Sequence, residues 1–424
     1  ALYLDNGINP ANVGPTEDIS SSFDNGQTPS LYRPLDGNRR PYSSQWNFTI
    51  GKEFPQNLAV TLSYVGTKGT HLPSALSPLN VLNPNNKALS SLGSDLSVSY
   101  NSPDGPATFA QDGVAVPYVG WADQMTGCSP TIGQALLPYP QYCGNLQGLN
   151  EGHANSIYNS FQGKVERRMH QGLYLLGSLT VSKLYTNGTY STQSAAGGTG
   201  SNNGQFSPYD PGREWALSPG NVPITLQISA DYDLPFGHNQ RFLSTGGPLN
   251  VLVGGWQVSP LYRYEYGTPM WFTSSSCPTA DLAPEFNQSC VPGILSGQRP
   301  LLHGRDGFDP AKYNGQYLNP LAFESDFSTF GYTGYGKAVS TVYGSPYKDV
   351  DVAFAKNTKI SERVTFKFTA NFFNLFNNHY FVSQGEGPGL PWVNDVAAPG
   401  NSFGQWNGTV SNPRNIQVAG RIEF

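Results

Sequence analysis

Apolar and polar residues alternate along nine separate stretches of the chain, and the last ten residues show the pattern most simply. Ile416, Val418, Ile422 and Phe424 are apolar, and the residues between them are polar or small. A period of two residues predicts a β-strand with one apolar and one polar face. Because chain termini usually fray, an apolar strand that runs to the last residue is expected to be held in a larger sheet. The nine stretches expected to form strands are 46–51, 58–64, 161–168, 173–182, 224–234, 256–266, 349–354, 364–372 and 415–424.

Short and long connections alternate between these stretches. The short ones are residues 55–57, 170–172, 235–255 and 359–363, and the long ones are 69–157, 185–222, 276–345 and 377–413. A compact soluble domain rarely contains several loops of more than about 15 residues. Transmembrane β-barrels regularly combine short periplasmic turns with long extracellular loops. The pattern therefore predicts an all-β, antiparallel transmembrane β-barrel in the bacterial outer membrane.

Charged residues recur on the polar faces of the predicted strands. In an outer-membrane barrel the apolar face meets lipid and the polar face lines the interior. The polar residues predicted to face the lumen are Lys164, Glu166, Arg168, Asp231, Asp233, Arg263, Glu265, Asp349, Asp351, Lys367, Arg421 and Glu423. Alternation alone also fits a secreted, soluble β-rich protein in which the apolar face is a core. The loop pattern favours the barrel.

The amino-acid composition argues against a nucleic-acid partner and against a transmembrane helix. Charged residues make up 12% of the chain and aromatic residues 13%, with 48 glycines, 34 prolines and a formal net charge of −5. There is no cluster of lysine and arginine, so no nucleic-acid partner is expected. No run of about 18 apolar residues is present, so no transmembrane helix is expected either.

The four cysteines form two local pairs, Cys128 with Cys143 and Cys277 with Cys290. Both pairs lie in stretches rich in Gly, Pro, Ser and Asn, which predicts two loop disulfides and an oxidising compartment. The alternative is four free, buried thiols.

Catalytic and metal-binding patterns are weak. The six histidines are scattered without paired spacing, so no metal site, cofactor or enzymatic activity is expected. Asp231 with Asp233, and Asp349 with Asp351, could each form an acid/base pair or a cation site. The favoured interpretation is that they pair with basic residues on neighbouring strands. The loop aromatics Trp121, Tyr139, Trp215, Trp392 and Trp406 could stack on sugar rings, but packing of the long loops is the favoured interpretation.

Several stretches resemble the C-terminal barrel portion of TonB-dependent outer-membrane transporters, and in particular the Oar-like branch of acidobacteria and myxobacteria. The similarity covers most predicted strands in the same order. The stretches that carry it are SSQWNFTIGKEFPQNLAVTLSYVGTKGTHL (43–72), SIYNSFQGKVERRMHQGLYLLGSLTVSK (156–183), ADYDLPFG (230–237), GGWQVSPLYRYEYGTPM (254–270), ERVTFKFTANFFNLFNNHYF (362–381) and NPRNIQVAGRIEF (412–424).

The resemblance implies a 22-stranded barrel, closed by an N-terminal plug domain and energised by the TonB complex. No stretch resembles the plug, and nine strands is an odd number where bacterial barrels have even counts. We therefore expect residues 43–424 to be the C-terminal part of the barrel, about nine strands of a larger protein, and residues 1–42 to be an extracellular loop segment. The resemblance also implies that Ile422 and Phe424 belong to a C-terminal signal read by the barrel-assembly machinery.

The function expected from this resemblance is TonB-dependent uptake of a large or scarce solute across the outer membrane. The implied partners are outer-membrane lipid, the plug domain, TonB, the assembly machinery and an unidentified solute. Two alternatives remain open. One is a surface protein of the same fold that acts in adhesion or export, and the other is the secreted, soluble β-rich binding protein or enzyme.

Overall fold

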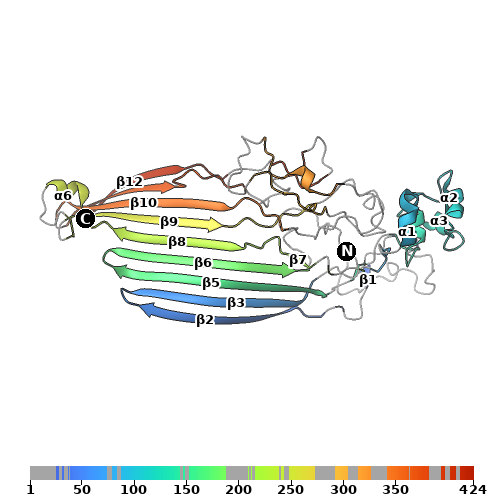
Figure 1. Cartoon of the computed structure of the whole chain (residues 1–424), viewed down its shortest axis with the longest axis horizontal. Helices are drawn as coiled ribbons and strands as arrows, with labels where there is room; N and C mark the ends of the chain where they lie inside the picture. Colours follow the sequence, from blue (N-terminus) through green and yellow to red (C-terminus); the bar gives the residue numbers. More distant parts are fainter. Residues whose placement is uncertain are drawn as a thin grey trace, which may run out of the picture.

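A long antiparallel sheet dominates the computed structural model of the chain. Nine strands follow one another across this sheet in the order β12-β11-β10-β9-β8-β6-β5-β3-β2, so each is paired with its neighbours in sequence (Figure 1). Their bounds are β2 Tyr42–Phe54, β3 Leu58–Leu72, β5 Ala154–His170, β6 Leu173–Thr186, β8 Ile224–Asp233, β9 Trp256–Glu265, β10 Tyr347–Lys359, β11 Thr365–Phe373 and β12 Asn415–Glu423. All nine predicted strands are present, and the prediction of an all-β antiparallel fold is confirmed.

The structure describes about two thirds of the chain, including all nine long strands. The described residues are 25–27, 31–32, 37, 39–73, 79–83, 87–143, 147–148, 152–187, 209, 212, 215–237, 240–242, 248–272, 292–303, 314–325, 341–361, 363–381, 393–396, 402–406 and 411–424. Three short strands complete the inventory: β1 Leu31–Tyr32 pairs in parallel with β4 Gln147–Gly148, and β7 Ala216–Leu217 pairs with β6.

The short connections lie at one end of the sheet, together with the C-terminus (Figure 1). Gln171 and Gly172 form a two-residue turn with φ of 51° and 78°, and two positive φ angles match the twist of a tight hairpin. Gln56 and Asn57 also have positive φ, at 67° and 59°. The connection from β8 to β9 contains a helix, α6 Pro248–Val253, which the sequence pattern did not predict. We call this end of the sheet the turn end and the opposite end the loop end.

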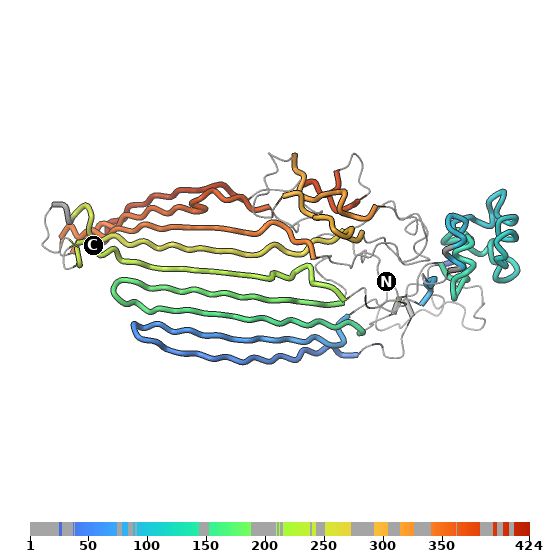
Figure 2. The backbone as a smooth tube through the Cα atoms, viewed as in Figure 1, coloured from blue at the N-terminus to red at the C-terminus, as the bar shows by residue number. Residues whose placement is uncertain are grey.

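The sheet is a single layer along the strands, with the long connections gathered beyond its loop end (Figure 2). The two clusters of buried apolar residues in the described part of the chain both lie in those connections, and neither includes a residue of the nine long strands. Many large apolar side chains of the strands are exposed instead, among them Phe48, Val418 and Ile422. No helix in the described part of the chain is long and apolar enough to cross a membrane.

The connection between β3 and β5 contains several short helices at the far end of the molecule (Figure 1). We call its described residues 79–83 and 87–143 the helical module. Its elements are α1 Lys87–Leu92, the 3₁₀ helix η3 Gly93–Ser97, α2 Gly105–Gln111, α3 Trp121–Gln124 and α4 Ile132–Ala135. None exceeds seven residues, which is too short for a helical period to stand out in the sequence. These helices were therefore not among the predicted elements.

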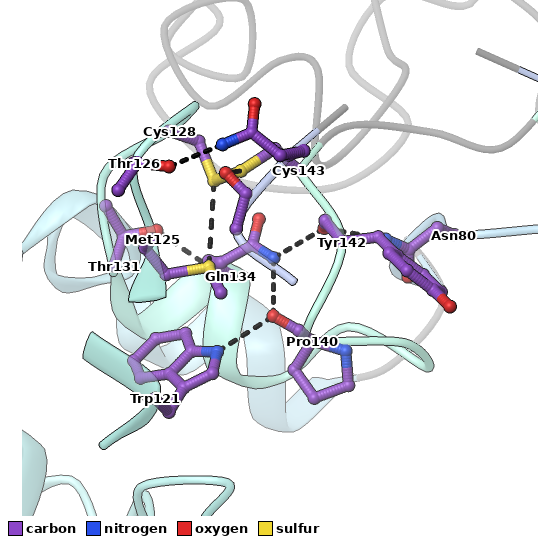
Figure 3. The surroundings of a disulfide bond; sticks show 12 residues. Asn80, Trp121, Met125, Thr126, Cys128, Thr131, Gln134, Pro140, Tyr142 and Cys143 are labelled. Carbon is purple, nitrogen blue, oxygen red and sulfur yellow. Dashed lines mark hydrogen bonds between the residues drawn. A yellow bond between two sulfur atoms is a disulfide. The ribbon is translucent and has the colours of Figure 1, made fainter. Parts of the chain in front are cut away.

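The helical module has its own core and a disulfide (Figure 3). Phe109, Trp121 and Ile132 are almost completely buried in it. Cys128 and Cys143 form a disulfide, as predicted, whereas Cys277 and Cys290 lie outside the described residues. The prediction that Trp121 packs the loop rather than facing a ligand agrees with its complete burial.

Within the helical module, Gln134 links helix α4 to the segment that leads to Cys143 (Figure 3). Its side chain is fully buried, and its amide nitrogen donates to the backbone oxygens of Pro140 at 2.8 Å and Tyr142 at 2.7 Å. Trp121 Nε1 donates to the same Pro140 oxygen at 2.8 Å. These bonds satisfy carbonyl groups that would be costly to bury without a partner.

A second core joins the β9–β10 connection to the β11–β12 connection. Phe323 packs edge-on against Phe272 and Phe403, with ring centroids 4.7 and 5.0 Å apart. Trp406 packs against Phe381 at 5.8 Å. The short 3₁₀ helix η6 Pro320–Ala322 lies in this region. Of the remaining loop aromatics, Trp215 stacks on Tyr185, Tyr139 is half-exposed, and Trp392 lies outside the described residues.

Candidate functional site

The strand register places all twelve predicted lumen residues on one face of the sheet. Arg263 lies opposite Asp349, and Lys367 lies opposite Arg421. Residues two apart on a strand share a face, which adds Asp351, Glu265 and Glu423 to the same side. The remaining members follow through the pairings of β5, β6 and β8. We call this side the polar face and the other the apolar face.

Arg263 is the centre of the least exposed charge cluster on the polar face. Its Nη2 lies 2.8 Å from Asp349 Oδ2 and 3.2 Å from Asp351 Oδ2. Tyr347 donates its hydroxyl to Asp349 at 3.1 Å, and its ring lies 5.9 Å from the Arg263 guanidinium carbon. Both carboxylates are thus paired with the same basic residue of the neighbouring strand, in line with the favoured interpretation of Asp349 and Asp351 as ion-paired residues.

Two more exposed groups of three charges each lie elsewhere on the polar face. On β5, Glu166 contacts Lys164 at 2.9 Å and Arg168 at 3.8 Å. At the turn end, Glu423 contacts Lys367 at 3.4 Å and Arg421 at 3.5 Å. Asp231 accepts a hydrogen bond from Ser259 on β9 at 2.5 Å. Asp233 lies across from Gln257, and Glu265 across from Thr225 and Tyr347.

A pocket of about 750 Å³ opens beside the Arg263 cluster at the loop end of β10–β12. Its wall is formed where the β11–β12 connection leaves and returns to the sheet. Asn374 holds the two ends together, because its Nδ2 donates to the backbone oxygens of Asn378 at 2.9 Å and Asn412 at 3.2 Å. The Asn374 backbone N–H also donates to Asp351 Oδ1 at 2.9 Å, so the loop base is tied directly to the charge cluster.

Most residues that line the pocket were not among the predicted site residues. Beside the charge cluster, the lining includes Tyr347, Asn374, Asn378, Tyr380, Ser411, Asn412, Arg414 and Asn415. Asn374 and Asn377 have positive φ, at 50° and 54°, a conformation that asparagine tolerates better than most residues. The run Asn374-Leu375-Phe376-Asn377-Asn378 was therefore the one available signal. Amide, hydroxyl and guanidinium groups beside aromatic rings equip this pocket to bind a polar solute.

Every charged residue at the paired positions of the apolar face is basic. These residues are Lys52, Lys68, Arg167, Lys183, Lys348 and Lys356. Three of them lie close to aromatic rings: Lys52 to Phe54 at 5.3 Å, Lys348 to Tyr264 at 6.0 Å and Lys356 to Trp256 at 5.2 Å. Basic residues with aromatic partners are typical of the boundary between hydrocarbon and headgroups.

The basic residues of the apolar face lie in two rows at a constant separation. On β10, Lys348 near the loop end and Lys356 near the turn end are eight residues apart. Lys52 near the turn end pairs with Val60, and Val60 is eight residues from Lys68 on β3. Eight residues of extended chain span about 26 Å.

Arg167 and Lys183, the third pair of basic residues, have the same separation of eight strand positions. Lys183 of β6 pairs with Asn159 of β5, and Asn159 is eight residues from Arg167. Between the two rows, the apolar face carries aliphatic and aromatic side chains with glycine, alanine and a few small polar residues. We call this region the apolar belt. The belt extends about 26 Å along the strands, and with the strand tilt of about 35–45° usual in outer-membrane barrels this corresponds to a height of about 20 Å, near the apolar band of about 25 Å.

The described residues contain no group of three or more His, Cys, Asp or Glu side chains arranged to hold a metal ion. The site consists of a charged, hydrogen-bonded wall on one side of a sheet and an apolar belt on the other. Such an arrangement can bind and guide a polar solute by hydrogen bonds and charge.

Comparison with known proteins identifies the family to which the chain belongs. A family described as "Outer membrane beta barrel domain" matches residues 1–417. No curated protein sequence matches the chain. Among solved structures, the outer membrane transporter YddB from Escherichia coli is 8% identical, with a TM-score of 0.36 over 94% of this chain and 34% of that chain.

Two receptors give similar values. The ferripyoverdine receptor of the outer membrane of Pseudomonas aeruginosa is 9% identical, with a TM-score of 0.33 over 90% of this chain and 27% of that chain. BauA, the ferric preacinetobactin receptor from Acinetobacter baumannii, is 9% identical, with a TM-score of 0.33 over 90% of this chain and 29% of that chain. The chain thus spans between a quarter and about a third of the length of these proteins.

Proposed function

This chain belongs to the family of outer membrane β-barrel domains, and on that premise we propose that its nine-stranded sheet is part of the wall of a barrel that imports a large or scarce solute. The protein resides in the bacterial outer membrane. In the proposed arrangement, the apolar belt faces lipid and the polar face encloses an aqueous lumen. The loop end is extracellular and the turn end periplasmic.

The observation that carries this proposal is the pair of basic rows on the apolar face. In a soluble protein with a core on this face, nothing would favour basic residues at this position of the sheet. Yet three pairs of them are separated by eight strand positions, measured along β3, β5 and β10. A lipid bilayer supplies the reason, because the rows can reach headgroups on both sides while the residues between them remain in hydrocarbon. The two buried clusters lie in the loops, which also speaks against a soluble protein with a core on this face.

The polar face supports a transport mechanism of the plugged type. We propose that the twelve charged residues hold a plug domain by ion pairs and hydrogen bonds, and that rearrangement of the plug opens a path along them. The resemblance to TonB-dependent transporters implies that the TonB complex supplies the energy. The pocket beside Arg263 lies at the loop end of the wall, where an extracellular solute would first meet the charged lining.

Closure of the barrel requires further strands. The edge strands β2 and β12 are the first and the ninth strand of an alternating antiparallel order, eight pairings apart, and therefore run in the same direction. An all-antiparallel barrel needs an odd number of additional strands between them. Since unpaired backbone groups are not tolerated in hydrocarbon, we propose that residues 43–424 are the C-terminal part of a larger barrel, with residues 1–42 in an extracellular loop and Ile422 and Phe424 in the assembly signal.

Uptake is tested in cells that carry or lack the complete gene. We expect accumulation of at least one of three labelled probes, a ferric chelate, cobalamin or a linear oligosaccharide, to depend on the gene and to be abolished by a protonophore. The protonophore separates energised uptake from passive surface binding. Equal accumulation of all three probes in both strains would count against transport of these classes.

A role in adhesion or export is the second candidate. The helical module favours it, because a loop with its own core and disulfide projects beyond the sheet at the proposed extracellular end (Figure 1). Deletion of residues 79–143 within the full-length protein separates the two functions. Loss of cell attachment with normal uptake would assign the module to adhesion.

A further inference from the structure

A shallow hollow of about 540 Å³ lies on the apolar face at the loop end of β3, β5, β6 and β8. It is separate from the pocket on the polar face and has no part in the proposed solute path. Its lining combines aromatic, aliphatic and basic side chains. The main contributors are Tyr64, Phe161, Val181, Lys183, Ile224 and Tyr266.

The floor of the hollow is apolar and its polar groups are satisfied internally. Phe161 and Val181 face each other across β5 and β6, and their side chains are 47% and 43% exposed. Tyr64 donates its hydroxyl to Asn159 Oδ1 at 2.6 Å. Tyr266 and Tyr343 form a wall by edge-to-face packing at 5.1 Å. An apolar recess with aromatic walls suits a hydrocarbon chain.

The rim of the hollow is basic. Lys183 lines it, and Lys68 occupies the next place in the same basic row, on the other side of β5. Both side chains are exposed, and neither forms an ion pair with a residue that the structure describes. The paired positions of this face carry no carboxylate, so an anionic group would meet no repulsion there.

We propose that this hollow binds a phosphorylated glycolipid of the outer leaflet, with an acyl chain in the recess and phosphates on Lys183 and Lys68. The occupant must be amphiphilic, because the hollow crosses the upper boundary of the apolar belt. It must be anionic, because the rim is basic.

A glycolipid fits the separation of the two lysines better than a phospholipid does. Lys68 and Lys183 are two strands and two residues apart in the register, which corresponds to about 12 Å between their Cα atoms. A disaccharide headgroup with a phosphate at each end spans a comparable distance. A phospholipid offers a single phosphate, which both lysines meet only when their side chains extend toward each other, whereas two phosphates meet the lysines without that constraint.

The test uses the full-length protein extracted from outer membranes in a mild non-ionic detergent. The probe is fluorescently labelled lipopolysaccharide with a doubly phosphorylated lipid anchor, and phosphatidylglycerol and inorganic phosphate serve as competitors. We expect the Lys68→Ala/Lys183→Ala variant to raise the Kd for the probe at least tenfold. Val181→Trp, which fills the recess, should have a similar effect. Folding of each variant is checked by its heat-dependent mobility on gels.

Lys52→Ala/Lys356→Ala is the matched control, because it removes two basic residues of the same face at the turn end. Its Kd should stay within twofold of the native value. An equal loss in the control variant would overturn the proposal, and so would competition by phosphatidylglycerol as strong as by unlabelled lipopolysaccharide. If Val181→Trp does not assemble, the lysine variant carries the test, because both lysines are exposed. Solute uptake is measured separately, so failure here would leave the transport proposal standing.

Discussion

Arg263 Nη2 lies 2.8 Å from Asp349 Oδ2 across the β9–β10 pairing and 3.2 Å from Asp351 Oδ2, so one cation serves two carboxylates. The side chains of Asp349 and Asp351 are only 11% and 20% exposed, whereas that of Arg263 is 41% exposed. Water therefore solvates the two carboxylates less well than the guanidinium, and loss of the ion pair would cost the carboxylates more. Asp351 also accepts the Asn374 N–H, which connects this charge cluster to the base of the β11–β12 connection.

Replacement of Arg263 by alanine should destabilise the sheet. Two partly buried like charges would remain side by side without a cation, and loss of one partner of a fully buried pair costs about 3–5 kcal/mol. Because Arg263 is partly exposed and screened by water, we expect about 1–2 kcal/mol. Urea unfolding of the full-length protein in lipid vesicles measures the change.

The control for Arg263→Ala removes all three charges. Arg263→Gln/Asp349→Asn/Asp351→Asn keeps the side-chain volumes close to native and leaves no unpaired charge. It should recover most of the lost stability. A triple variant less stable than Arg263→Ala would show that the ion pairs are not the cause.

The sequence predicted the sheet well because the signal for a half-exposed strand is local. Ile416, Val418 and Ile422 alternate with polar or small neighbours, and the same rule assigned all twelve charged residues to one face. Membrane strands obey this rule more strictly than most soluble strands, because lipid contacts one face along the whole apolar belt.

The helical module and the pocket could not be predicted in the same way. The helices around Trp121 are held by individual contacts that follow no periodic pattern, such as the Cys128–Cys143 disulfide and the Gln134 bonds to Pro140 and Tyr142. The pocket depends on Asn374, whose partners Asn378 and Asn412 become neighbours only when the loop closes. Alternation within a strand carries no information on either arrangement.

Gly404 should be intolerant of a side chain. Its φ is 76°, and an added Cβ would overlap the Cβ of the buried Leu318. Gly297 has nearly the same φ, 79°, but open space around its Cβ position. Both alanine variants therefore carry the backbone cost of about 1–2 kcal/mol, and only Gly404→Ala adds a clash in the second core.

Limited proteolysis of the full-length protein in intact cells compares the two glycine variants. We expect the β9–β10 connection to be cleaved several times faster in Gly404→Ala than in Gly297→Ala. Equal cleavage rates would mean that Leu318 and its neighbours move aside without cost.

The disulfide should govern the stability of the helical module but not that of the sheet. Cys128 and Cys143 close a loop with a sequence separation of 15, and a loop of this length corresponds to about 3 kcal/mol of chain entropy. In Cys128→Ser/Cys143→Ser, we expect the module to become sensitive to protease while the heat-dependent mobility of the barrel is unchanged. A reductant should reproduce the effect in the native protein and have none in the double variant.

Leu179 and Thr180 test which face of the sheet meets lipid, because they are neighbours on β6 with opposite orientations. Leu179 lies between Gly163 and Leu226 on the apolar face, and Thr180 lies between Gln162 and Thr225 on the polar face. Leu179 is four residues from Lys183 and thus near the middle of the apolar belt. A lysine at the middle of a lipid-facing band costs about 2–4 kcal/mol, whereas a lysine in an aqueous lumen costs little. Leu179→Lys should therefore lower the free energy of unfolding in vesicles by that amount and reduce assembly into the outer membrane, and Thr180→Lys should stay within about 0.5 kcal/mol of native. The reverse order of stabilities would place the charged residues in lipid and remove the basis for a lumen on the polar face.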